Sequence, residues 1–320
     1  MKAPRHINPI KVAAVPILLL LLLCSGCSCR YESLNVDGIR RDYLLHVPET
    51  LPPGVSVPLV LALHQFSDTP RGMRKMTGFD AIADREGFIV AYPRGAQRRW
   101  RSGITDDDRD IQFLDALLDA LIEAYPVDAD RVYAAGASAG AMMIQRFACH
   151  SDRLAAIAPV MGSLSASFAD ACQPAMPVPA LVIHGIEDPV IPYEGGRAGG
   201  PHESYFLSAE ETAAFWARAA ACDATPTTDV EPLDEDVFLR RYIYGCPDNG
   251  EVRLYAVGGC GHSWPGHRSR YPGCIVGPSI TTLNASEIIW DFFQRHGRSA
   301  SEKNAFCPPT STRANDGHIQ

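Results

Sequence analysis

The chain has 320 residues, of which 46% are hydrophobic and 21% charged, and its formal net charge at pH 7 is −8. This length and composition suit one large globular domain of the α/β kind or two small ones. Because the charge is negative and the body of the chain has no basic cluster, the composition argues against nucleic acid as a partner.

The chain opens with the features of an export signal. Basic residues precede an apolar stretch over residues 12–23, which is shorter than a transmembrane helix requires. Small residues then lead to Cys27, as in the bacterial lipoprotein signal, although Cys24 stands where leucine is usual. We expect residues 1–27 to be a lipoprotein-type signal peptide, with ordinary cleavage near Cys27 and release as the alternative. Either way the mature protein lies outside the cytoplasm, in the cell envelope or outside the cell. If the signal is of the lipoprotein type, lipid on Cys27 is the one expected membrane contact.

The cysteine content agrees with export. Ten cysteines are present, and eight remain once Cys24 and Cys27 are set aside. An even number in an exported protein predicts disulfide bonds. Proximity along the chain favours three pairs, and a fourth would join the two ends. These pairs are Cys149 with Cys172, Cys222 with Cys246, Cys260 with Cys274, and Cys29 with Cys307.

Hydrophobic patterns predict strands alternating with helices. A β-hairpin is expected over 31–48, where alternating residues flank the turn Asp37-Gly38. Short apolar runs predict buried strands, and apolar residues at helical spacing predict helices. The expected strands or apolar runs are 59–63, 88–92, 132–135, 154–160, 180–183, 237–244 and 252–257. The expected helices are 79–86, 111–124, 141–148, 209–221 and 285–296, with loops over 94–109 and 260–266.

This alternation implies a mostly parallel sheet covered by helices on both faces, an α/β fold. We expect it to occupy residues 28–298, followed by a polar tail over 299–320. Ligands of such sheets bind at the carboxyl ends of the strands. The polar residues that follow predicted strands are His64, Ser138, Asp188 and His262.

Residues 136–140 form the pattern G-x-S-x-G between a predicted strand and a predicted helix. This is the context of a nucleophile elbow, a strained turn that lifts a serine hydroxyl above the sheet edge. Glycine at both ends lets strand and helix pass closely, and the helix N-terminus directs N–H groups at developing negative charge. Ser138 is therefore the candidate nucleophile, although the bare pattern also occurs in turns without chemistry.

A serine nucleophile needs a base, and the base needs an acid that fixes its tautomer. In elbow enzymes the acid and then the histidine follow the serine along the chain. Asp188 follows one predicted strand and His262 lies in a Gly-rich loop after another, so the order is met. The competing candidates are Glu187 and Glu194 for the acid, and His184 for the base.

Several motifs together resemble a known family. They are residues 58–64, Tyr92-Pro93, 132–142, 184–193 and 261–266, with a late helix over 285–293. Over residues 31 to 297 the chain is similar to the exported polyhydroxybutyrate depolymerase and feruloyl esterase family of α/β-hydrolases. The resemblance implies an α/β-hydrolase fold and an ester substrate cleaved by Ser138 as nucleophile, His262 as base and Asp188 as acid. This chemistry needs no cofactor.

One departure from the family pattern concerns the loop after the first core strand. Family members usually carry His-Gly there, whereas this chain has His64-Gln65. We expect the backbone N–H of Phe66, or else of Gln65, to complete the oxyanion hole with that of Ala139. A side chain at position 65 would reshape the hole or the acyl pocket. The expected substrate contacts are His64, Gln65 and Trp264.

Two hypotheses of other classes stay open. Cys260, His262, His267 and Cys274 lie within fifteen residues and could bind zinc, but the spacing is not a standard finger and exported cysteines usually pair. We therefore expect no metal. The second hypothesis is a surface lipoprotein that has the hydrolase fold but binds a ligand without catalysis. The intact Ser-Asp-His order argues against it. For the substrate, short hydroxyacyl esters such as 3-hydroxybutyrate oligomers are slightly favoured over feruloyl esters, because no pattern demonstrates an aromatic-stacking pocket.

Overall fold

The computed structural model describes residues 30–103, 107–174, 176–198, 205–247 and 250–298. One compact unit begins at Tyr31, and the described helices and strands all belong to it. The predicted signal peptide with Cys27, the pair Cys29–Cys307 and the predicted tail lie outside the described residues. None of the helices in the described ranges has both the length and the apolar character needed to cross a membrane.

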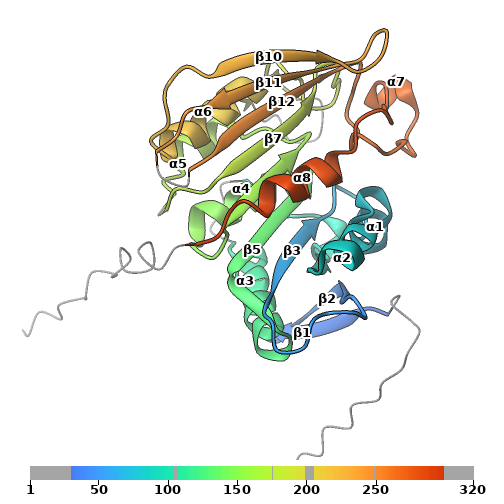
Figure 1. The fold of residues 1–320 in the computed structure, drawn as a ribbon, viewed down its shortest axis with the longest axis vertical. Coiled ribbons are helices and arrows are strands. Elements are labelled where there is room, and N and C mark those ends of the chain that lie inside the picture. Colours follow the sequence, from blue (N-terminus) through green and yellow to red (C-terminus); the bar gives the residue numbers. More distant parts are fainter. Residues whose placement is uncertain (1–29, 104–106, 175, 199–204, 248–249, 299–320) are drawn as a thin grey trace, which may run out of the picture. The chain divides into compact units, whose positions relative to one another are not determined.

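The described strands form a ten-stranded sheet in the order β1-β2-β4-β3-β5-β6-β7-β12-β11-β10 (Figure 1). Its strands are β1 Glu32–Val36, β2 Ile39–His46, β3 Val57–Leu63, β4 Ile89–Pro93, β5 Val127–Ala137, β6 Ala156–Val160, β7 Ala180–Gly185, β10 Thr227–Pro232, β11 Phe238–Tyr244 and β12 Val252–Gly258. The six from β4 to β12 are mutually parallel. Antiparallel strands extend the sheet at each side, which confirms the predicted N-terminal hairpin.

Helices cover both faces of the sheet. They are α1 Pro70–Thr77, α2 Phe79–Glu86, α3 Arg109–Ala124, α4 Ala139–His150, α5 Ala166–Ala171, α6 Ala209–Ala219, α7 Gly273–Val276 and α8 Ala285–Phe293. The shorter elements are the 3₁₀ turn Ala96–Arg98 and the ribbon of β8 Gly196–Arg197 with β9 Tyr205–Phe206. Buried residues of α3, α4 and α6 pack in one core, and those of α1, α2 and α8 in a second. Figure 1 shows α8 crossing the second face.

The central strands have no polar face because both sides of the sheet are covered. All seven residues of β3 are buried, and alternate side chains point to opposite faces. Leu59 and Leu61 enter the core under α3, α4 and α6, whereas Val60 and Ala62 enter the core under α1, α2 and α8. The continuous apolar run that predicted a parallel core strand is explained by this double burial. The α/β prediction is confirmed.

Helix α1 and strand β10 are among the elements that the sequence patterns did not predict. Helix α1 has a glycine in its middle and few apolar residues; its available signal is Thr69, whose side chain accepts a hydrogen bond from Gly72 N–H, followed by Pro70 at the first position. Strand β10 is exposed along its whole length, so it shows no alternation. It forms because β11 offers an edge to pair with.

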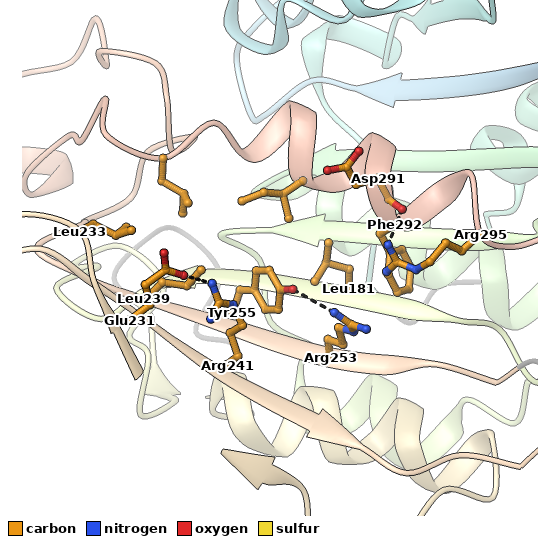
Figure 2. Close-up of a pocket in the computed structure, with 12 residues that line it drawn as sticks. Leu181, Glu231, Leu233, Leu239, Arg241, Arg253, Tyr255, Asp291, Phe292 and Arg295 are labelled. Atoms are coloured by element: carbon orange, nitrogen blue, oxygen red, sulfur yellow. Dashed lines mark hydrogen bonds and ion pairs between the residues drawn. The ribbon is translucent and has the colours of Figure 1, made fainter. Parts of the chain in front are cut away.

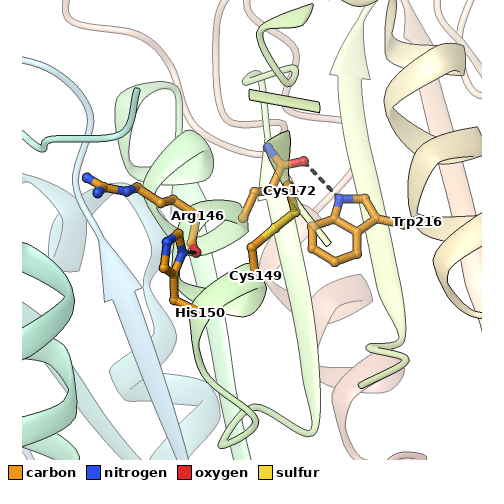
Figure 3. The surroundings of a disulfide bond; sticks show 6 residues. Arg146, Cys149, His150, Cys172 and Trp216 are labelled. Carbon is orange, nitrogen blue, oxygen red and sulfur yellow. Dashed lines mark hydrogen bonds between the residues drawn. A yellow bond between two sulfur atoms is a disulfide. The ribbon is translucent and has the colours of Figure 1, made fainter. Parts of the chain in front are cut away.

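Two of the predicted disulfides are present. Cys149 at the end of α4 is bonded to Cys172 just after α5, and Figure 3 shows this bond between Trp216 and the last turn of α4. Cys222, which follows α6, is bonded to Cys246, which follows β11.

The third predicted pair, Cys260 with Cys274, is wrong in this structure. Both cysteines are free. The Cys260 side chain is buried, with its sulfur 3.4 Å from the Ser263 hydroxyl, whereas Cys274 is exposed on α7. Sequence proximity does not make two side chains point toward each other, and a disulfide needs both the distance and the direction.

Candidate active site

Ser138 lies between the end of β5 and the start of α4, with backbone angles φ 53° and ψ −115°. This conformation is costly for a residue with a side chain and persists only when its surroundings enforce it. The close packing around the neighbouring glycines enforces this conformation of Ser138. A Cβ on Gly140 would overlap the carbonyl oxygen of Leu63 in β3, and one on Gly136 would overlap the carbonyl of Gly140. Strand and helix therefore pass at a distance that only glycine permits.

The structure brings Ser138, Asp188 and His262 together from three loops at the carboxyl ends of β5, β7 and β12. His262 Nε2 lies 2.9 Å from Ser138 Oγ across 124 residues of chain, and His262 Nδ1 lies 2.7 Å from Asp188 Oδ2. A neutral imidazole whose Nδ1–H donates to the carboxylate leaves Nε2 free to accept the serine proton. Both hydrogen bonds have the lengths that a nucleophile, base and acid require.

Asp188 is buried and held in one orientation. Its Oδ1 accepts the backbone N–H groups of Val190 at 2.8 Å and Ile191 at 2.9 Å, which leaves Oδ2 for His262. Burial raises the pKa of Asp188, but hydrogen bonds from His184 and His262 outweigh it, so the pKa ends below its usual range. The carboxyl group is therefore ionised at neutral pH.

The other acids considered for this role lie elsewhere. Glu187 is exposed, and its carboxylate accepts the backbone N–H of Cys260 at 3.0 Å. Glu194 is exposed as well. Of the three carboxylates, Asp188 is the one within hydrogen-bond distance of His262.

His184 contacts the acid and not the serine. Its Nε2 lies 2.8 Å from the carbonyl oxygen of Ile191 and 3.4 Å from Asp188 Oδ2, so this nitrogen carries the proton. Its Nδ1 is buried without a hydrogen-bond partner, as suits the unprotonated nitrogen of a neutral ring. The sequence shows only a histidine at the end of a strand, four residues before an aspartate, and does not reveal this contact.

The two expected oxyanion donors come from different elements. Ala139 is the first residue of α4, where a backbone N–H has no intrahelical acceptor. Phe66 lies in the turn after β3, which the hydrogen bond from Asp68 N to Gln65 O closes at 3.1 Å. The Phe66 ring is half exposed and lies 5.0 Å from the Arg99 guanidinium. The Gln65 side chain turns to Asp68, with Nε2 donating to Oδ2 at 3.3 Å.

His64 was predicted to contact substrate, but it is fully buried. Its Nδ1 lies 2.8 Å from the carbonyl oxygen of Gln65, and its Nε2 accepts the backbone N–H of Gly95 at 3.0 Å. The His64 carbonyl accepts the indole N–H of Trp100 at 2.9 Å. His64 therefore fixes the loop after β3 from behind, and both of its ring nitrogens are already occupied.

A cavity of about 390 Å³ opens beside His262. Gln65 and Trp264, two of the predicted substrate contacts, line it. The Trp264 ring is nearly buried and its Nε1–H donates to Ser286 Oγ at 3.0 Å, so it offers the cavity an apolar wall and no free donor. We call this space the His262 cavity.

A second cavity, of about 360 Å³, lies between α8 and the strands β10, β11 and β12 (Figure 2). Its charged side chains pair with groups already present. Arg241 pairs with Glu231, and Arg253 donates to the Tyr255 hydroxyl at 3.2 Å. None of Ser138, Asp188 and His262 lines this cavity.

The four residues of the zinc hypothesis are not gathered into a site. Cys260 is buried, Cys274 is exposed, and both ring nitrogens of His262 face Ser138 and Asp188. Within the described ranges, no group of three or more His, Cys, Asp and Glu side chains is placed to hold a metal ion.

The fold and the placement of these residues define the α/β-hydrolase class. The solved structure of an acetyl xylan esterase from Aspergillus awamori has the same fold, with a TM-score of 0.55 at 15% identity, over 83% of this chain and 99% of that one. The family model described as "Esterase PHB depolymerase" matches residues 43–190.

Curated relatives agree with the family model. NocK of Nocardia uniformis subsp. tsuyamanensis, provisionally named an esterase, is 32% identical over 278 residues, 80% of each chain. Feruloyl esterase B of Piromyces equi is 28% identical over 236 residues, which are 70% of this chain but 42% of that protein. The chain therefore belongs to the PHB depolymerase family of esterases and is a carboxylic ester hydrolase, as the resemblance in its motifs predicted.

Proposed function

We propose that this enzyme cleaves esters through an acyl-enzyme on Ser138, with His262 as general base and acid and Asp188 as the acid that orients it. One observation carries the proposal: hydrogen bonds of 2.9 and 2.7 Å link Ser138 Oγ, the two nitrogens of His262 and Asp188 Oδ2 in an unbroken series. Membership of an esterase family indicates an ester substrate, and this series of hydrogen bonds provides the groups that would attack it.

The reaction follows from the proton positions. His262 Nε2 takes the serine proton as Oγ attacks the acyl carbon, and the ionised Asp188 stabilises the imidazolium that forms. The backbone N–H of Ala139 and that of Phe66 hold the oxyanion, where a preorganised donor is worth on the order of 10²–10³ in kcat. His262 then protonates the departing alcohol, and a water molecule activated in the same way releases the acid.

For the acyl group we propose short hydroxyacyl esters, such as 3-hydroxybutyrate oligomers, ahead of feruloyl esters. Support comes from the matching family model, whose description names a PHB depolymerase, an esterase that acts on hydroxyacyl esters. Feruloyl esters stay the second candidate, because relatives carry that activity in their names.

We also propose that the enzyme works outside the cytoplasm, anchored by lipid on Cys27. Support comes from the two disulfides, which form and persist in oxidising compartments. Mass spectrometry of the native N-terminal peptide tests the anchor. A peptide that begins elsewhere, or that lacks lipid, refutes it.

The activity itself is tested with purified mature protein and its Ser138→Ala variant on four esters: a 3-hydroxybutyrate dimer, methyl ferulate, p-nitrophenyl butyrate and p-nitrophenyl palmitate. We expect the dimer or the short p-nitrophenyl ester to have the highest kcat/KM, and the variant to be inactive on all four. Preference for the palmitate would indicate a lipase. More than a few per cent of activity in the variant would remove Ser138 from the mechanism.

A further inference from the structure

We propose that the His262 cavity binds a carboxylate on the alcohol half of the ester, so that the preferred leaving group is a hydroxy acid with its carboxyl group free. This inference rests on the proposed triad mechanism and adds to it the charge of the substrate.

The charge of the cavity wall is the first observation. Three cationic side chains line it: Lys75 of α1, and Arg268 and Arg270, which follow His262 along the chain. Asp68 is the one acidic residue in the wall, and its buried carboxylate already pairs with Arg270 at 3.0 Å. The cavity therefore carries more positive than negative charge, in a chain whose net charge is −8.

Of the three cationic side chains in the wall, Lys75 and Arg268 have no acidic partner among the described residues. Within the described part of the chain, no carboxylate lies within ion-pair distance of either side chain, whereas many of the other described arginines have such a partner. Two unneutralised cations on one wall repel each other, and a bound anion removes that repulsion. His267, between them in the wall, adds no third charge, because burial and then the charge of Lys75 lower its pKa.

The position of the cavity assigns the anion to the alcohol half. His262 protonates the departing oxygen, so the alcohol half of the ester must lie against its ring. His262 and the next two residues form one wall of the cavity, whereas Ser138, which holds the acyl group, is not part of it. A group in this space is therefore attached to the leaving oxygen and not to the acyl carbon.

The remaining wall suits the carbon skeleton of a hydroxy acid. Met76, Met161 and Trp264 provide an apolar surface between the catalytic histidine and the cations. A 3-hydroxyacyl leaving group has the matching order: an alkoxide oxygen, a short hydrocarbon segment and a carboxylate. An ester of this kind arises at the acid end of a hydroxyacyl oligomer, so the enzyme would release terminal units.

The test compares a 3-hydroxybutyrate dimer with a free carboxyl group and the same dimer as its methyl ester, in which a methyl group replaces the negative charge. For both substrates, hydrolysis of the ester bond between the two hydroxybutyrate units is followed. The enzymes are wild type, Lys75→Gln, Arg268→Gln, the double variant, and Arg40→Gln as a matched loss of one exposed cation that does not line the cavity. KM and kcat are measured for both substrates at 0.05 M and 0.5 M NaCl.

We expect wild type to have a kcat/KM about 10-fold higher for the free acid, since a charge-assisted hydrogen bond from an exposed cation is worth about one such factor. Each cavity variant should raise KM for the free acid about 3- to 10-fold and leave the methyl ester within about 2-fold, as Arg40→Gln should for both. High salt should weaken the free-acid preference.

Equal kcat/KM for the two substrates in wild type would overturn the inference, and so would cavity variants that slow both alike. Each result leaves the triad mechanism standing, because the methyl ester is still hydrolysed and Ser138→Ala still abolishes that hydrolysis. If wild type hydrolyses neither dimer nor any p-nitrophenyl ester, the proposed function fails, and this inference fails with it.

Discussion

Replacing Asp188 by asparagine exchanges one oxygen for an NH₂ group and should disable His262 without moving it. The structure fixes which way the new amide turns. Two backbone N–H groups, of Val190 and Ile191, point at Oδ1 at 2.8 and 2.9 Å. The asparagine oxygen must stay with these donors, because the flipped amide would leave both unpaired at about 1–3 kcal/mol each.

The NH₂ group therefore takes the place of Oδ2 and faces His262 Nδ1. That nitrogen must then accept a hydrogen bond, which puts the ring proton on Nε2, the atom 2.9 Å from Ser138 Oγ. A protonated Nε2 cannot take the serine proton. We expect kcat to fall about 10⁴-fold, or about 5.5 kcal/mol of transition-state stabilisation. His184 retains its shorter hydrogen bond to Ile191 O, so the surrounding packing stays in place.

The assay is steady-state hydrolysis of p-nitrophenyl butyrate at pH 7.5, with circular dichroism to check the fold. Glu187→Gln is the matched control: it neutralises the adjacent residue, whose carboxylate contacts Cys260 N–H and not the histidine. We expect that control to stay within about 3-fold of wild type, as exposed substitutions usually do. Retention of a tenth or more of the activity by Asp188→Asn, or a larger loss in the control, would refute the tautomer argument.

Three further predictions concern the surroundings of the triad. Gly140→Ala forces a Cβ into a carbonyl oxygen of β3, so we expect no activity and a loss of at least about 2 kcal/mol in stability, measured by chemical unfolding. Cys149→Ser should cost about 2–4 kcal/mol. Alkylation of the denaturant-unfolded protein without reductant should label Cys260 and Cys274 but none of the four disulfide-bonded cysteines, and an unlabelled Cys260 would contradict the structure. His184→Gln should raise the low pKa of Asp188, because one of the hydrogen bonds that lower it is weakened. In an NMR titration of the Asp188 side-chain carboxyl group, the midpoint should then lie at a higher pH than in wild type, and an unchanged midpoint would contradict the role of His184.

The parts of the fold and site that sequence predicts are those set by local chemistry. Residues 136–140 place small residues on each side of Ser138, and the strand and helix that flank them are apolar at their own periods. The apolar run of β3 is continuous because both faces of that strand are covered. Such a run predicts a buried strand even when the covering helices are not known. Chain order then supplies Asp188 and His262, since elbow enzymes keep that order.

The features of the site that the sequence did not predict are those that depend on the direction of side chains. His64 directly follows β3, yet its ring is buried and accepts the backbone N–H of Gly95. The Cys260 thiol turns into the core and away from Cys274. The His262 cavity combines Lys75, from a helix that the patterns missed, with Arg268 from a loop far along the chain. Such contacts arise only when the sheet order is known.

The central claim is that Ser138 is a nucleophile activated by His262, and reaction with a fluorophosphonate tests it most directly because it needs no knowledge of the substrate. Peptide mapping after labelling should find the phosphonyl group on Ser138 in wild type. Ser138→Ala should not be labelled, and His262→Ala should be labelled at least about 10³-fold more slowly. No labelling of the folded wild-type protein, or labelling at another serine with Ser138 untouched, would contradict the account.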